Sequence, residues 1–143
     1  MSAAVLKIND LETEFDTRDG IVKAVDKVSY EVGQGETLGV VGESGCGKSV
    51  TSLSILRLIP NPPGRISGGE VLFKGEDLTK VSESRIREVR GNEISMIFQE
   101  PMTALNPVHN IGKQLKEVFT LKFPEMTKSE VIKASVEMLE KVG

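Results

Sequence analysis

The chain has 143 residues, of which 38% are hydrophobic and 27% are charged, and its formal net charge is −3. This composition is typical of a soluble globular domain, and the charge gives no electrostatic reason to expect a nucleic-acid partner. No apolar run approaches the roughly 20 residues of a membrane span, and the start lacks the pattern of a secretory signal, so we expect a cytosolic chain. Cys46 is the only cysteine, which excludes an internal disulfide and a cysteine-cluster metal site.

The first 36 residues alternate apolar and polar side chains, as strands with one solvated face do. We predict three strands, at residues 5–15, 21–26 and 28–32, with a turn at residues 16–20 after the first. A second glycine-containing turn, at residues 33–36, leads into the next segment. The sequence therefore predicts an antiparallel β subdomain at the start of the chain.

The segment at residues 42–49 fits the phosphate-binding pattern of a glycine, four free residues and then Gly-Lys-Ser. The apolar run at residues 37–41 before it is typical of a buried parallel strand, and residues 49–59 after it have helical spacing. This strand, loop and helix order is the setting that the pattern requires. It predicts a nucleoside triphosphate site formed by Gly42, Glu43, Ser44, Gly45, Cys46, Gly47, Lys48 and Ser49, with the start of the helix through Val50.

Each residue type in this loop has a chemical task. Gly42, Gly45 and Gly47 are expected to take positive φ angles and to let the backbone approach phosphates without a Cβ in the way. Successive N–H groups and the helix N-terminus would then point at the anion. Lys48 would place a positive charge on the β- and γ-phosphates, and the Ser49 hydroxyl would bind Mg²⁺, which prefers oxygen ligands.

Proline and glycine at residues 60–64 end the helix. A strand is predicted at residues 69–74, a turn at 75–77 and a short amphipathic helix at 82–90. The Ile-Ser-Gly-Gly-Glu run at residues 66–70 is predicted to be a turn. The apolar run at residues 94–98 is a further predicted strand, and it ends in Gln99, where open α/β sheets place ligand contacts.

Two helices are predicted after Gln99. The first covers residues 108–121. The second opens with Thr127 and Glu130, which are spaced as a capping box, and Met126 and Val131 are placed for a hydrophobic staple. An apolar stripe follows along one face of this helix, made of Val131, Ala134, Met138, Leu139 and Val142.

Taken together, these motifs resemble the nucleotide-binding subunits of ABC transporters. The general resemblance lies in Phe15, the phosphate loop, the hairpin at residues 69–75 and Gln99, in that order. The amino-acid sequence at residues 42–51, 91–103 and 105–107 is similar to that of the oligopeptide and dipeptide importer branch. This narrower resemblance extends over nearly the whole chain. The resemblance implies an α/β fold: a partial P-loop NTPase core of the RecA type (37–100), preceded by an antiparallel β subdomain (1–36) and followed by the start of a helical subdomain (101–143).

The resemblance also assigns roles. Phe15 matches the position whose ring stacks on adenine, although an ordinary core phenylalanine has the same sequence signal. Gln99 matches the residue that joins Mg²⁺ and the attacking water to the membrane subunit, and the alternative is an ordinary polar strand end. Lys48 and Gln99 are thus the catalytic candidates, and Ser49 and Gln99 the metal candidates. The family's signature, Walker B and switch-histidine motifs are expected after Gly143, so this chain is expected to bind ATP and Mg²⁺ with little or no hydrolysis of its own.

The implied partners are integral-membrane permease subunits, a second ATP-binding subunit and, indirectly, an extracytoplasmic substrate-binding protein. The implied location is the cytoplasmic face of the membrane. The resemblance favours peptides as the transported substrate, with nickel or glutathione as alternatives. Two other functions remain open: an ABC-type ATPase outside transport, which the lack of basic patches disfavours, and another P-loop enzyme such as a small-molecule kinase, which has no need of the Gln99 segment.

Overall fold

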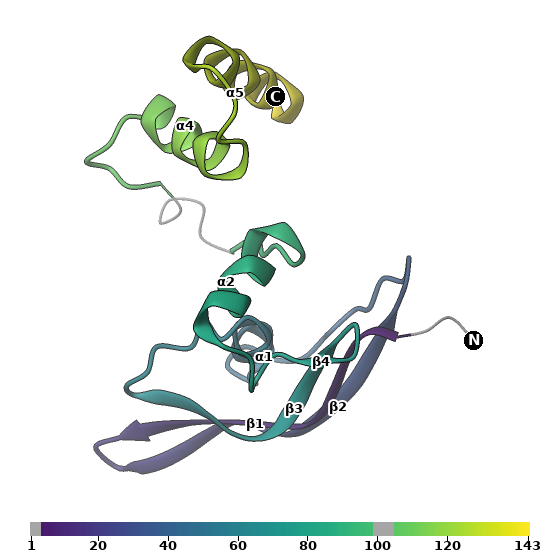
Figure 1. Cartoon of the computed structure of the whole chain (residues 1–143). Helices are drawn as coiled ribbons and strands as arrows, with labels where there is room; N and C mark the ends of the chain where they lie inside the picture. Colours follow the sequence, from purple (N-terminus) through teal and green to yellow (C-terminus); the bar gives the residue numbers. More distant parts are fainter. Residues whose placement is uncertain (1–3, 99–104) are drawn as a thin grey trace. The chain divides into compact units, whose positions relative to one another are not determined.

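The computed structural model of this chain describes residues 4–98 and 105–143 (Figure 1). The chain divides into two compact units, Met1–Met96 and Ile97–Gly143. Within the described residues, every helix is too short or too polar to cross a bilayer. The finer division at residues 36 and 100 stays a prediction.

The first unit contains a four-stranded antiparallel sheet in the order β2-β1-β3-β4. The central strand β1 pairs with β2 on one side and with β3 on the other, and Figure 1 shows the long β1–β2 hairpin and β3 side by side. The strands are β1 (Ala4–Thr17), β2 (Gly20–Gly33), β3 (Gly64–Phe73) and β4 (Glu76–Asp77). The sheet therefore joins residues from both sides of the phosphate loop.

Strand β2 is continuous, where the sequence analysis predicted two strands. Leu11 pairs with Val28 and Thr13 with Val25, so β2 uses one more residue than β1 across this step. The extra residue forms a bulge in which Lys27 has a left-handed φ of 50°. The bulge changes the face of the sheet that the following side chains occupy. The alternation of apolar and polar residues is therefore interrupted there, as it would be between two separate strands.

The run at residues 66–70 lies inside β3, so its assignment to a turn was wrong. Asn9 pairs with Glu70 and Glu12 with Gly68, which leaves two β1 residues opposite Gly69 alone. Gly69 has a φ of 78°, and a Cβ there would collide with the backbone carbonyl of Asp10. Gly69 thus allows two strands to approach closely at a bulge.

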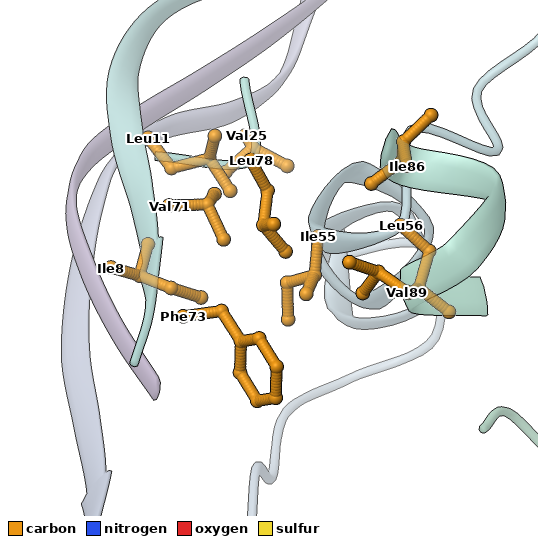
Figure 2. Close-up of a cluster of buried hydrophobic side chains, with 10 residues drawn as sticks. All are labelled: Ile8, Leu11, Val25, Ile55, Leu56, Val71, Phe73, Leu78, Ile86 and Val89. Atoms are coloured by element: carbon orange, nitrogen blue, oxygen red, sulfur yellow. The ribbon is translucent and has the colours of Figure 1, made fainter. Parts of the chain in front are cut away.

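Helices α1 (Lys48–Ile55) and α2 (Glu83–Asn92) belong to the same unit as the sheet. α1 is shorter than the predicted helix at 49–59, and α2 begins at its Ser82 N-cap, whose hydroxyl accepts from the Arg85 N–H at 3.2 Å. Figure 2 shows side chains from the sheet and from both helices converging on one core. Its members are Ile8, Leu11, Val25, Ile55, Leu56, Val71, Phe73, Leu78, Ile86 and Val89.

Residues 37–41 and 94–98 do not form strands, so these two predictions were wrong. A strand persists only when its backbone groups pair with a neighbour. Among the described residues neither segment has such a ladder, apart from a single bridge between Arg90 and Ile94. Several of their apolar side chains are correspondingly open to solvent, with Val41 at 92% and Ile97 at 97% exposure, whereas Ile94 and Met96 are half-buried.

The second unit contains helices α4 (Ile111–Lys122) and α5 (Lys128–Val142). Asn110 caps α4, since its side chain accepts from the Lys113 N–H at 2.8 Å. The predicted capping box of α5 is confirmed: Glu130 N–H donates to the Thr127 hydroxyl, and the Glu130 carboxylate accepts from the Thr127 N–H at 2.7 Å. Of the predicted apolar stripe, Val131 is buried, whereas Met138, Leu139 and Val142 are exposed.

Candidate nucleotide site

The phosphate loop, residues 42–49, follows β2 after the turn at residues 33–36 and the segment at residues 37–41. It ends in the first turn of α1. Gly45 and Gly47 have φ angles of 81° and 89°, as predicted. The prediction of a positive φ was wrong for Gly42, which instead provides space: a Cβ there would lie 2.6 Å from the Cys46 sulfur. The loop therefore needs glycine for two different reasons, backbone conformation at Gly45 and Gly47 and close packing at Gly42.

Gly47 also fixes the loop against the sheet. A Cβ on Gly47 would collide with the Ala24 carbonyl of β2 and would lie 3.9 Å from a Val25 methyl group. Only a glycine allows this approach in addition to supplying the left-handed φ. The start of α1 is consequently held directly on β2.

Lys48 is folded back over its own loop. Its ammonium donates to the Gly42 and Glu43 carbonyl oxygens, each at 2.6 Å, and lies 3.4 Å from the Cys46 sulfur. These contacts account for the three donors of an ammonium group. To bind a phosphate in the predicted way, Lys48 must exchange carbonyl oxygens for phosphate oxygens, which are charged and therefore stronger acceptors.

The N-terminus of α1 suits an anion. The N-cap residue Gly47 offers no side-chain cap, and the first turn contains no acidic residue. The N–H groups of a first helical turn have no partner within the helix, and the helix dipole places partial positive charge there. Ser49 is exposed at this end, and Val50 packs partly on the core. The residues present thus fit a nucleotide phosphate chain, with Ser49 as an oxygen ligand for Mg²⁺.

A buried hydroxyl contact, which the sequence analysis missed, joins α1 to the sheet. The Thr13 and Ser54 hydroxyl oxygens lie 2.8 Å apart, and both side chains are fully buried. Ser54 also donates to the Val50 carbonyl at 2.7 Å, so its single proton is used there and Thr13 is the donor between the two hydroxyls. The only available signal was a pair of polar residues, Thr51 and Ser54, spaced to face the core from a helix.

The other two predicted site residues are not brought to the loop by the described contacts. Phe15 is half-buried near the end of β1, opposite Val22 and Gly64. Its ring lies over Gly64, where a Cβ would come within 2.7 Å of the ring. Gln99 lies outside the described residues. Glu43 and Ser44 are exposed on the loop itself.

A surface cavity of about 370 Å³ lies at the other end of α1. Arg57, Arg65, Arg90 and Glu83 contribute to its walls, and no residue of the phosphate loop does. In the described part of the chain, no group of three or more His, Cys, Asp or Glu side chains is arranged to hold a metal ion.

Known proteins match the chain over most of its length. The family model described as ABC transporter matches residues 25–142. The chain is 49% identical to the probable peptide ABC transporter ATP-binding protein y4tR of Sinorhizobium fredii, over 96% of this chain and 41% of the relative. It is 50% identical to the oligopeptide transport ATP-binding protein OppD of Bacillus subtilis, over 97% of this chain and 38% of the relative. The chain thus spans about two fifths of the length of these curated relatives.

Among solved structures, the chain matches the dimeric post-hydrolysis state of the ATP-binding cassette MJ0796 bound to ADP and Pi. The TM-score is 0.76 at 20% identity, over 94% of this chain and 56% of that one. At this identity the match establishes the fold alone, and it confirms the predicted class: a partial P-loop ABC fold, here with an antiparallel sheet and flanking helices. On the strength of the family match over most of its length, the chain belongs to the ABC transporter family.

Proposed function

We propose that this chain is the ATP-binding part of an ABC importer subunit and that it binds MgATP at residues 42–49. The observation that carries the proposal is the loop geometry: left-handed Gly45 and Gly47 lead into an uncapped helix N-terminus beside Lys48. Relatives that are named as ATP-binding proteins match this chain almost from end to end. Both observations favour a nucleotide over another phosphorylated ligand.

In this proposal the backbone from Gly42 to Val50 surrounds the phosphates and Lys48 neutralises their charge. Ser49 and Gln99 would hold Mg²⁺, Gln99 would orient the attacking water, and Phe15 would stack on adenine. Together with Lys48, Gln99 would serve in catalysis. In this proposal, a protein of the relatives' full length couples hydrolysis to transport, and this chain binds the nucleotide.

The proposed partners are integral-membrane permease subunits, a second ATP-binding subunit and, indirectly, an extracytoplasmic substrate-binding protein. The proposed location is the cytoplasmic face of the membrane. The relatives' names, which include peptide, oligopeptide and dipeptide transport, favour peptides as the substrate over nickel or glutathione. They also favour transport over the non-transport ATPase and the small-molecule kinase.

Titration calorimetry with MgATP tests the proposal. Lys48→Met removes the ammonium and should weaken binding by roughly tenfold or more, because charge-assisted hydrogen bonds each contribute about 1.5–3 kcal/mol. Lys133→Met is the matched control, because Lys133 is an exposed lysine of α5 whose ammonium lies 3.9 Å from the Glu137 carboxylate, at the outer limit of an ion pair. Circular dichroism verifies that both variants fold. Equal affinity of the wild type and Lys48→Met, or no binding by the wild type, would refute the proposal.

A further inference from the structure

The end of α2 contacts the end of α1 through one arginine. The Arg90 guanidinium donates from Nε to the Leu56 carbonyl and from Nη2 to the Arg57 carbonyl, both at 2.8 Å. Leu56 is the C-cap of α1, so these acceptors lie where a helix leaves its last carbonyls without partners and carries partial negative charge. Arg90 therefore caps α1 from a different helix.

The Glu83 carboxylate forms ion pairs with both Arg90 and Arg57 next to this cap. Glu83 lies 3.4 Å from Arg90 Nη1 through one oxygen and 3.4 Å from Arg57 Nη2 through the other. The Arg57 guanidinium also donates to the Val81 carbonyl at 2.8 Å. The two arginine side chains are 29% and 26% exposed, so they are oriented by several fixed partners rather than by solvent.

Apolar packing lies beneath these polar contacts. Ile86 and Val89 of α2 are fully buried, and Ile55 and Leu56 of α1 are at most 9% exposed. Figure 2 shows Val89 beside Leu56, with Ile86 directed into the same core. Close-packed interiors transmit displacement because they resist compression. The two helices are thus coupled by both packing and directional hydrogen bonds.

The backbone changes direction at Arg90. Arg90 has φ −62° and ψ 119°, and Gly91 has a left-handed φ of 77°. The Ile94 N–H then donates to the Val89 carbonyl at 2.9 Å, and Ile94 forms a parallel bridge with Arg90. Ile94 and Met96 pack partly on the core. The path of residues 91–96 therefore starts from a position that the Arg90 side chain fixes on α1.

The opposite end of α1 carries the phosphate loop. Eight helical residues span about 12 Å, so α1 is a short rigid element with Gly47 and Lys48 at one end and the carbonyls bound by Arg90 at the other. From this juxtaposition we propose that Arg90 is a positioning residue that couples the phosphate loop to residues 91–96. The proposal rests on MgATP binding at the loop. Its consequence for the family reaction is that the segment leading towards Gln99 responds to the nucleotide.

Hydrogen exchange with and without saturating MgATP tests this coupling. In the wild type, MgATP should slow exchange in the loop and also at the Glu93 and Ile94 amides, by roughly fivefold or more, the lower range of coupling between sites. In Arg90→Met the loop should still respond, but the response at residues 93–94 should disappear. Arg90→Lys keeps the charge and loses the planar fork, so it should retain only part of the response.

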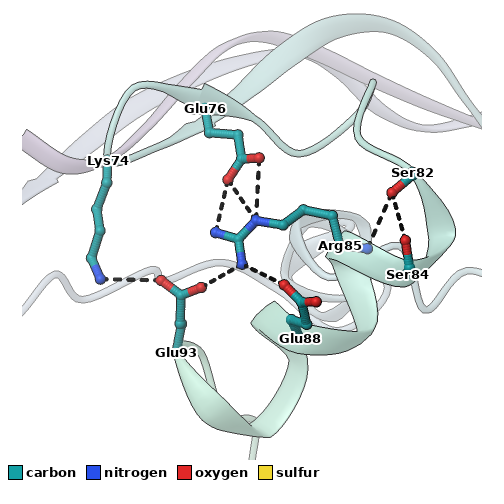
Figure 3. A network of polar contacts seen from close by, with 7 residues as sticks. All are labelled: Lys74, Glu76, Ser82, Ser84, Arg85, Glu88 and Glu93. Carbon is teal, nitrogen blue, oxygen red and sulfur yellow. Dashed lines mark hydrogen bonds and ion pairs between the residues drawn. The ribbon is translucent and has the colours of Figure 1, made fainter.

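Arg85→Met is the matched control. Arg85 lies on the same helix but binds Glu76 at 2.8 Å and Glu93 at 2.7 Å, and Figure 3 shows this network without any α1 residue. Its loss should raise basal exchange at residue 93 while leaving the MgATP-dependent difference at residue 94. A merely structural role of Arg90 would change basal exchange only, as in this control.

The outcomes separate the two proposals. No response in the wild-type loop refutes nucleotide binding and this inference with it. A loop response without a response at residues 93–94 in the wild type, or an undiminished response at those residues in Arg90→Met, overturns the inference alone. If Arg90→Met does not fold, the Arg90→Lys result decides: a response equal to that of the wild type contradicts the positioning role.

Discussion

The two units of this chain are built on different sources of stability. In the first, ten hydrophobic side chains share one core; they come from three strands, from two helices and from the segments beside them, and Leu78 is one of the ten. In the second, α4 buries no residue and α5 buries only Val131 and Ser135. Yet the helix ends of the second unit are at least as well capped, by Asn110 and by the Thr127 capping box. Caps thus define where a helix begins, whereas burial across elements distant in sequence supplies most of the stability.

One substitution in each unit tests this contrast in stability. Leu11→Ala removes a fully buried side chain and should destabilise the first unit by about 2–5 kcal/mol, from lost transfer energy and the cavity that remains. Leu121→Ala, at 77% exposure in α4, should change stability by less than about 0.5 kcal/mol. Urea unfolding followed by circular dichroism measures both, and similar losses at the two sites would remove the contrast.

The next effect concerns the loop that the first unit holds in place. Gly47→Ala should cost about 1–3 kcal/mol from left-handed φ alone, and the collision with the Ala24 carbonyl adds to this cost, so MgATP binding should also be lost. Gly35→Ala is the control, since Gly35 has a φ of 75° but nothing within 4 Å of its Cβ position. It should cost about 1–2 kcal/mol and preserve binding. A Gly47→Ala protein with wild-type affinity would show that close approach to β2 is unnecessary.

Local signals were enough for several of these features. The glycines at 45 and 47 were predicted correctly because their conformation depends on the loop alone, and the Thr127 capping box because it spans four residues. Features that depend on distant partners were not. The strands expected at 37–41 and 94–98 have no ladder among the described residues, and Gly69 serves a bulge against β1. The contact between Thr13 and Ser54 joins residues 41 apart, which one sequence cannot pair.

Removing either hydroxyl of the Thr13–Ser54 contact should have a smaller effect on stability, and the two substitutions should differ in size. Ser54→Ala leaves the Thr13 hydroxyl buried without its acceptor and should cost about 1–3 kcal/mol. Thr13→Val should cost less, because Ser54 keeps its bond to the Val50 carbonyl. The double variant should be less destabilised than the sum of the two singles, as a double-mutant cycle of unfolding free energies would reveal. Strict additivity would mean that the two hydroxyls do not interact.

The smallest effect lies in the second unit and depends on pH. Hydrogen bonds from the Thr127 hydroxyl and backbone N–H lower the pKa of Glu130 below its ordinary value of 4.5. The stabilisation is therefore complete above pH 4.5 and is lost as the pH falls through the lowered folded value. Relative to the intrinsic exchange rate at each pH, the Thr127 and Glu130 amides should lose protection over this acid range in the wild type. In Glu130→Gln these amides should be less protected at neutral pH and should lack that step, while Glu140→Gln should behave as the wild type.

Binding of MgATP at residues 42–49 can be measured at Cys46. This thiol is the chain's only cysteine, is exposed, and lies within the loop 3.4 Å from the Lys48 ammonium. We predict that saturating MgATP slows maleimide labelling of Cys46 by roughly tenfold or more, since bound ligand closes access in proportion to occupancy. Mg²⁺ alone should not slow it, and Lys48→Met should lose the protection. Equal labelling rates with and without MgATP would contradict binding of MgATP at residues 42–49.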